Sequence, residues 1–214
     1  ACTAQKSNFT IIGDITGLQI GDTIEFSTID LPSWKDNTAF TIIVDDTTGF
    51  SYRGNLEHDQ YFIFTYTTNE GKEIVADRRG QTFIVRPGDT ITFTGERENV
   101  YYSKISGGIY DEPQLAEYLR ADDSLGLVRG SYMRRLEEAR AAGDTAEMYR
   151  WGDAFNAFYN GNPGLERVRA LRRAYIDSNR QGTLFLLVQR LPDIGYEPID
   201  EMKQIYDNYS DQIK

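Results

Sequence analysis

Residues 105–119 read ISGGIYDEPQLAEYL, and the character of the sequence changes within this stretch. Up to Tyr110 the chain is rich in Thr, Ile, Phe, Tyr and Gly, whereas Ala, Leu, Glu and Arg dominate from Asp111 onward. Asp111 and Glu112 precede Pro113, and we expect a helix to begin here because proline suits the first helical turn and acidic residues suit its dipole. The sequence therefore predicts an α+β protein in which strands come first and helices follow.

Upstream of this stretch, β-rich runs recur about every 8–12 residues with turn residues between them. In DTITFTG, residues 89–95, Ile91 and Phe93 point to one face and the threonines to the other. We expect nine strands, in the runs FTIIGDITG, DTIEFSTI, AFTIIVDD, FSYRG, YFIFTYTT, EIVADRR, TFIVR, TITFTG and VYYSKIS. No helix-period segment separates them, so residues 9–110 are predicted to form an antiparallel β-sandwich or a partly open barrel.

Hairpin turns are expected at Thr48-Gly49 and at residues 69–72, and a Pro-Gly-Asp turn at residues 87–89.

Downstream, residues 111–214 are predicted to form a small helical bundle. Residues 122–124, Asp-Asp-Ser, are interpreted as the end of one helix and the cap of the next, and Gly143 as a stop. Asp144 and Glu147 have the spacing of a capping box before a helix with an aromatic stripe. TLFLLVQRL, residues 183–191, is predicted to be a buried central helix, and Glu197-Pro198 to start a last one.

Composition excludes several classes of function. The net charge of −10 argues against nucleic-acid binding, which needs a basic face. One Cys and one His can form neither an internal disulfide nor a standard zinc site, and no motif for another cofactor occurs. No apolar run is long enough to cross a membrane.

Three blocks resemble a known family: FTIIGDITGLQIGDTIEF (residues 9–26), FTIIVDDTTGFSYRG (residues 40–54) and FIVRPGDTITFTG (residues 83–95), with ISGGIYDEPQLAEYL similar to its junction. The family is a domain of unknown function found at the N-terminus of thioredoxin-like lipoproteins in Bacteroidetes. The resemblance covers residue 9 to about residue 119 closely and the helical remainder loosely. Its motifs are turn residues, so they are specific for fold rather than for chemistry.

In that family a thioredoxin-like domain of the alkyl-hydroperoxide-reductase/thiol-specific-antioxidant type, with a Cys-x-x-Cys motif, usually follows. The resemblance therefore implies that these residues are an accessory region beside such a redox domain. This sequence departs from the pattern because it ends at DNYSDQIK without that motif. No redox residue is carried over, and the sequence is compatible with a fragment or with a short family member.

The lone cysteine, Cys2, precedes a polar stretch, TAQKSN, at residues 3–8. Family members are typically exported lipoproteins, whose mature chain begins with a lipid-bearing cysteine. We expect residues 1–8 to be a flexible leader with the lipid on Cys2, which would place the protein in the bacterial cell envelope. The alternative is a chance free cysteine in a disordered terminus.

The remaining candidate residues favour structure over chemistry. His58, between Glu57 and Asp59, resembles a general base, but no second ligand or nucleophile accompanies it, and a surface loop is expected. Asp45-Asp46 is interpreted as the entrance to a turn. Trp34, in a polar loop, and Tyr101 and Tyr102, expected on a strand with one ring on each face, are candidates for binding a carbohydrate or a peptide.

Three functions remain open. The sequence favours a non-catalytic accessory region of an exported lipoprotein that positions a thioredoxin-like partner. The second is a stand-alone envelope module that binds carbohydrate or peptide. The third is an unrecognised hydrolase, which would need His58 or an acidic pair in a cleft.

Overall fold

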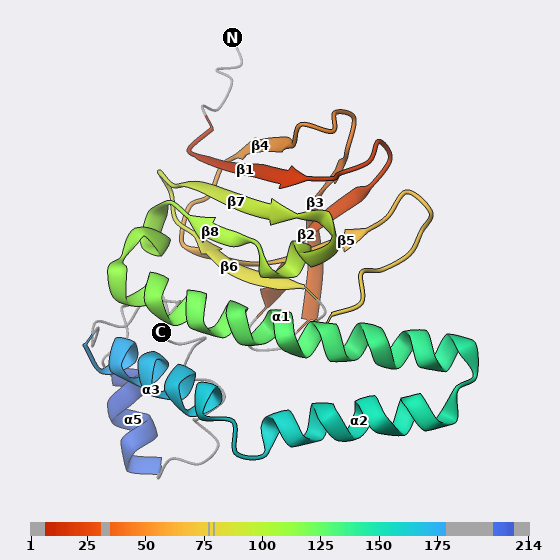
Figure 1. The fold of residues 1–214 in the computed structure, drawn as a ribbon. Coiled ribbons are helices and arrows are strands. Elements are labelled where there is room, and N and C mark those ends of the chain that lie inside the picture. Colours follow the sequence, from red (N-terminus) through yellow and green to blue (C-terminus); the bar gives the residue numbers. More distant parts are fainter. Residues whose placement is uncertain (1–6, 31–34, 77, 79, 179–198, 208–214) are drawn as a thin grey trace.

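A computed structural model describes residues 7–30, 35–76, 78, 80–178 and 199–207 (Figure 1). The strands are β1 (Phe9–Thr16), β2 (Thr23–Asp30), β3 (Lys35–Ile43), β4 (Phe50–Gly54), β5 (Gln60–Thr67), β6 (Gln81–Val85), β7 (Thr90–Glu96) and β8 (Lys104–Ser106). The helices are η1 (Arg97–Tyr102), η2 (Gly108–Asp111), α1 (Pro113–Ala142), α2 (Thr145–Tyr159), α3 (Pro163–Ser178) and α5 (Ile199–Asp207). The protein is therefore α+β, with the sheets before the helices, as the sequence predicts.

The strands form two four-stranded sheets, ordered β4-β1-β7-β8 and β3-β2-β5-β6. Their facing sides enclose an aromatic core, in which Phe26 stacks on Phe64 at 5.4 Å and Phe83 meets Phe93 edge to face at 4.8 Å between ring centroids. β1 alternates buried and exposed residues, so that Ile11 and Ile15 point inward. Burying each such side chain stabilises the fold by about 1.5–3 kcal/mol, and the sandwich rests mainly on this term.

The prediction of purely antiparallel pairing is wrong at one place, because β1 and β7 pair in parallel. The chain leaves β6 in one sheet, turns at Gly88, whose φ is 100°, and enters β7 in the other sheet beside β1. Likewise, Thr48-Gly49 does not close a hairpin, since β3 and β4 lie in different sheets. Turn residues indicate a reversal of the chain but not which strand lies next to which.

Two further predicted strands are wrong. The run at residues 73–79 forms no strand among its described residues, and only Glu73 makes an isolated bridge, to Thr67. In VYYSKIS only residues 104–106 are a strand, because Val100, Tyr101 and Tyr102 belong to η1. The side chains of these three residues are all buried. Apolar runs of this length fit a buried 3₁₀ turn as well as a strand, and tertiary packing decides between them.

A buried carboxylate ties three parts of the sandwich together. Asp22 is fully buried, and Arg97 donates two hydrogen bonds to it, from Nε to Oδ2 at 3.0 Å and from Nη2 to Oδ1 at 3.1 Å. Asp22 also accepts hydrogen bonds from the Tyr66 hydroxyl and from the backbone N–H groups of Gln19 (2.7 Å) and Asn69 (2.9 Å). Burial by itself would raise the pKa of Asp22, but these donors together hold it below its usual value.

The helices add two layers on one side of the sandwich. α1 lies beside the sheets, and α2 and α3 lie on the far side of α1 (Figure 1). The predicted start at Pro113 and stop at Gly143, whose φ is 67°, are confirmed, as is the cap in which Asp144 accepts from the Glu147 N–H at 3.1 Å. The predicted break at residues 122–124 is wrong, because α1 runs through them.

One hydrophobic core spans both secondary-structure types. Leu115 and Tyr118 of α1 and Val168 and Tyr175 of α3 belong to the same cluster of buried residues as the strands. The change at residues 110–111 is therefore a change of secondary structure within one packed unit of the described residues. The predicted helix at residues 183–191 and the Glu197-Pro198 start lie outside those residues. None of the helices that the structure describes is both long and apolar enough to cross a membrane.

Candidate functional site

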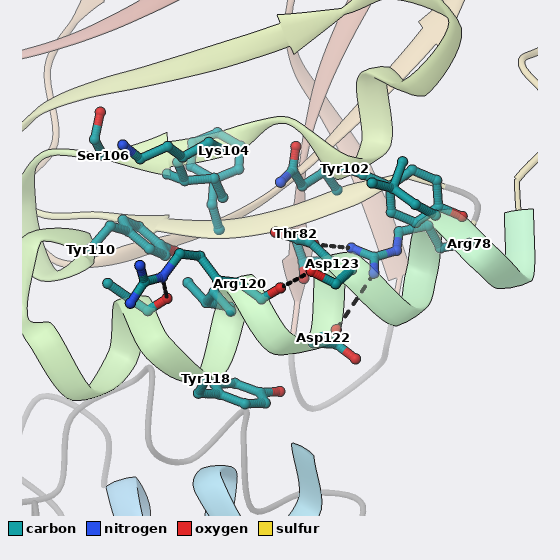
Figure 2. A pocket seen from close by; sticks show the side chains of 18 of the residues that line it. Arg78, Thr82, Tyr102, Lys104, Ser106, Tyr110, Tyr118, Arg120, Asp122 and Asp123 are labelled. Carbon is teal, nitrogen blue, oxygen red and sulfur yellow. Dashed lines mark hydrogen bonds and ion pairs between the residues drawn. The ribbon is translucent and has the colours of Figure 1, made fainter. Parts of the chain in front are cut away.

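A cavity of about 960 Å³ lies between the sandwich and the first half of α1 (Figure 2). β6 and β8 are the last strands of their sheets on this side. On the opposite side of the sandwich the stacked rings of Phe40 and Tyr52, 3.6 Å apart, join β3 to β4. The α1 side therefore has an opening between the two sheets, and the helix forms the outer wall of the cavity.

Two glycines allow α1 to approach the strands at this point. A Cβ atom at Gly126 would lie 2.5 Å from the Tyr102 ring, and one at Gly130 would lie 2.9 Å from the Tyr102 hydroxyl oxygen. The two positions are four residues apart and so share one helix face, which forms a notch for the ring. The small residues in GLVRG, residues 126–130, are the sequence signal that could have indicated this contact.

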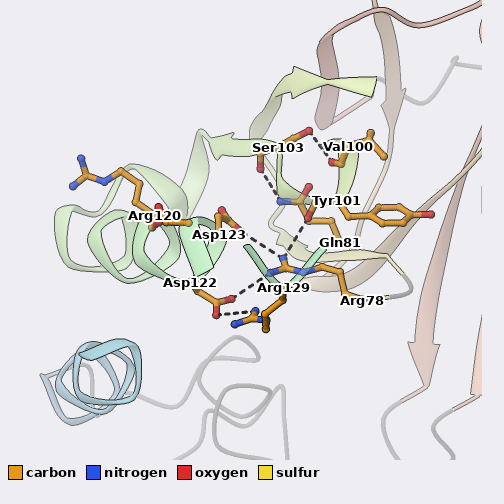
Figure 3. Close-up of polar contacts among 10 residues, drawn as sticks. Arg78, Gln81, Val100, Tyr101, Ser103, Arg120, Asp122, Asp123 and Arg129 are labelled. Carbon is orange, nitrogen blue, oxygen red and sulfur yellow. Dashed lines mark hydrogen bonds and ion pairs between the residues drawn. The ribbon is translucent and has the colours of Figure 1, made fainter. Parts of the chain in front are cut away.

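An ionic cluster forms one end of the cavity (Figure 3). Arg78, from the connection between β5 and β6, reaches Asp122 at 3.5 Å and Asp123 at 3.4 Å, and Arg129 reaches Asp122 at 3.6 Å. The Arg78 guanidinium also lies over the Tyr102 ring, 4.6 Å from its centroid. Burial raises the pKa of Asp123 to about 7, although Arg78 opposes the rise. The cluster therefore carries a carboxyl that is only partly ionised at neutral pH.

Gln81, in the cavity wall, holds a buried polar atom without a partner among the described residues. Its side chain is 3% exposed, and its Nε2 donates to the Ser103 carbonyl oxygen at 2.7 Å. Its Oε1 atom is buried and has no hydrogen-bond partner among the described residues. A buried polar atom left unpaired costs about 1–3 kcal/mol, so this atom lowers the stability of the fold by an amount of that order.

The sequence-predicted site residues are not brought together. Cys2 and Trp34 lie outside the described residues. Tyr101 is buried, and its hydroxyl accepts from the Tyr66 N–H at 3.0 Å and donates to the Tyr66 carbonyl at 3.2 Å, which is a structural role. Tyr102 is also buried but lines the cavity. Because both lie in η1, the expectation of one ring on each face of a strand is wrong.

The acidic and basic candidates lie in loops. His58 is exposed between β4 and β5. Asp46 accepts from the Thr48 N–H at 2.9 Å, as expected for a turn. Among the described residues, no group of His, Cys, Asp and Glu has the arrangement of a metal site. Sequence reasoning missed Arg78 and Gln81 altogether, since nothing local marks a residue whose partners are on α1 or η1.

Comparison with known proteins adds no relative: no family model matches this chain, and no curated protein matches it.

Proposed function

We propose that this chain is a non-catalytic binding module of an exported, lipid-anchored protein, and that its ligand occupies the cavity beside α1. The observation that carries the proposal is the cavity of about 960 Å³ between the sandwich and α1, which is lined by charged and polar side chains as well as apolar ones. Ligand sites are concave, mostly preformed and supplied with a few convergent polar groups, and this cavity has those properties.

The ionic cluster supports binding rather than catalysis. Asp122 and Asp123 both face Arg78, so neither carboxylate stands alone beside a nucleophile. The cluster spans α1 and the segment before β6, and it therefore fixes the distance between the two walls. We infer that its role is to hold the cavity open at a constant width.

A second candidate, an accessory role beside a thioredoxin-like domain, is favoured by the surface of α2. This helix carries Tyr149, Trp151 and Tyr159, yet none of its described residues is buried. Tyr149 is 72% exposed and Tyr159 is 46% exposed, whereas the Trp151 ring faces Tyr132 of α1, 6.1 Å away between ring centroids. An aromatic surface on the outer layer suits contact with a neighbouring domain, with Cys2 as the lipid attachment at the other end of the chain.

The binding role is tested by nuclear magnetic resonance with a panel of small saccharides, short peptides, amino acids and dicarboxylates. We expect at least one class to shift the backbone signals of the cavity wall. Ala116→Phe would fill the cavity and abolish those shifts, whereas Ala141→Phe, on the exposed end of α1, would leave them unchanged. Shifts that survive Ala116→Phe, or no shift with any class, would contradict the proposal.

The accessory role is tested by the intact mass of the mature protein extracted from its native envelope. A mass above 24.4 kDa by a domain of roughly 100–150 residues plus lipid would support it. A mass near 24.4 kDa plus lipid would remove the redox partner and leave the binding module alone.

A further inference from the structure

The cavity meets β6 and β8 at their edges rather than at their faces. Its lining includes consecutive residues of both strands, 81–83 of β6 and 104–106 of β8. Because successive side chains of a strand point to opposite faces, a cavity that touches consecutive residues faces the backbone. Each of these strands pairs on one side only, β6 with β5 and β8 with β7.

The direction of the β6 amides follows from one hydrogen bond. The Ile84 N–H donates to the Tyr110 hydroxyl at 2.8 Å and so points away from β5. In an antiparallel ladder the N–H and C=O groups of alternate residues point to the same side, and β5 and β6 pair without a register shift. The Thr82 N–H and C=O groups therefore also point outward, toward α1.

The Thr82 amide is open to a partner. No hydrogen bond joins its N–H to another described residue, and the Thr82 side chain is exposed between buried neighbours. Ala116 and Leu119 of α1 line the same cavity and make part of its outer wall apolar. The cavity is thus a groove between an edge strand and a helix, a geometry in which an added strand finds backbone partners on one wall and side-chain contacts on the other.

We propose that the ligand is an extended peptide that adds as a strand to the β6 edge at Thr82, with alternate side chains entering between β6 and α1. This inference rests on the proposed function. At one end of the groove the peptide meets the Arg78–Asp123 pair. At the other end, where Lys104, Ser106 and Arg120 lie (Figure 2), it places a carboxylate.

A saccharide fits the same cavity less well. Sugar rings stack on open aromatic faces, but the Tyr102 ring is covered by the Arg78 guanidinium and by the Gly126–Gly130 notch. Tyr110 is 3% exposed, and its hydroxyl already accepts from Ile84. The aromatic side chains of the cavity are therefore parts of its wall, and the groups that remain for a ligand belong largely to the backbone.

The test uses a phage-displayed library of random linear octapeptides, with the selected peptides synthesised and measured by fluorescence polarisation. Thr82→Pro removes the outward N–H and leaves the β5–β6 ladder intact, because proline is tolerated on the open side of an edge strand. The matched control, Thr82→Ala, keeps the N–H and removes only the hydroxyl, which bonds to the Tyr61 side chain, and the γ-methyl group. We expect Thr82→Pro to weaken binding about tenfold or more, and Thr82→Ala to change it by less than about threefold.

Amide hydrogen exchange supplies a second measurement that does not depend on the proline variant folding. On addition of a selected peptide to the wild-type protein, exchange at Thr82 should slow at least about tenfold, as expected for a new ladder hydrogen bond. Unchanged exchange, or equal binding by folded Thr82→Pro, overturns strand addition.

The failure of this inference differs from the failure of the proposed function. If no peptide is selected but a saccharide or dicarboxylate shifts the backbone signals of the cavity wall, the proposal of a peptide ligand is contradicted and the proposal of a binding module is kept. If neither class binds, both proposals fall.

Discussion

Replacing Asp22 by Asn should show how much of the stability of the sandwich depends on one buried charge. Three donors converge on the Oδ2 atom of Asp22 and two on Oδ1, so an amide NH₂ in either place faces at least two of these donors. Hydrogen bonds to a charged group are worth about 1.5–3 kcal/mol each, and breaking a buried pair costs about 3–5 kcal/mol. Because the Arg97 side chain is 21% exposed, water partly solvates its charge once the carboxylate is gone. We therefore expect Asp22→Asn to lower the free energy of unfolding by about 3 kcal/mol at pH 7.

The pH dependence of this loss tests its cause. The donors lower the pKa of Asp22 in the folded state, so the stabilisation is complete above about pH 4 and disappears as the pH falls through the folded pKa. Urea denaturation of both proteins at pH 7 and at pH 3 should show the difference in unfolding free energy narrowing at the lower pH. Asp45→Asn, in an exposed turn, is the control and should change stability by less than about 0.5 kcal/mol. A loss below 1 kcal/mol for Asp22→Asn at pH 7, or a difference that does not narrow, would refute the reasoning.

The other predictions concern one carboxyl, two glycines and one hydroxyl. Burial raises the folded pKa of Asp123 to about 7, so the unfolding free energy of the wild type relative to Asp123→Asn should fall by about 2–3 kcal/mol between pH 5 and pH 8 in urea titrations. A difference that stays constant or rises would contradict this. Gly107→Ala should lower the free energy of unfolding by more than about 2 kcal/mol, since φ is +89° and the added Cβ would lie 1.9 Å from the Thr90 carbonyl oxygen. Gly152→Ala, in open space within α2, should raise the free energy of unfolding by about 0.5–1 kcal/mol. Thermal unfolding of both variants checks this contrast. Tyr101→Phe should lower the free energy of unfolding by about 1–1.5 kcal/mol in chemical denaturation, because the Tyr101 hydroxyl bonds to the backbone N–H and C=O groups of Tyr66. An unchanged denaturation midpoint would contradict this prediction.

Much of the local structure was predictable because its causes are short-range. The alternation of Ile91 and Phe93 with threonines predicts β7, and both side chains are fully buried. Pro113 at the start of α1 and Gly143 at its end act through their own backbone angles, and Asp144 caps α2 through a hydrogen bond three residues away. The α+β order of the elements follows from such signals added along the chain.

Strand pairing and the continuity of the long helix α1 were less predictable because they depend on distant residues. The parallel contact of β1 with β7 joins residues about eighty positions apart, and nothing in either run of letters marks the other. Asp122 and Asp123 suggest a helix boundary by local propensity, yet the helix continues because Arg78 and Arg129 compensate both acids.

The sequence by itself thus determined the class of fold, the positions of most strands, the helix start at Pro113 and the helix stop at Gly143, through preferences that each residue expresses with its near neighbours. Only the tertiary structure decided the candidate site. Arg78 comes from the connection between β5 and β6, Gln81 from β6, Ser103 from the turn before β8 and Asp123 from α1. They meet because the sandwich is open on that side and the helix lies across the opening. Such a site is a product of packing, since the burial that leaves the Gln81 oxygen unpaired and raises the pKa of Asp123 exists only once the layers are assembled.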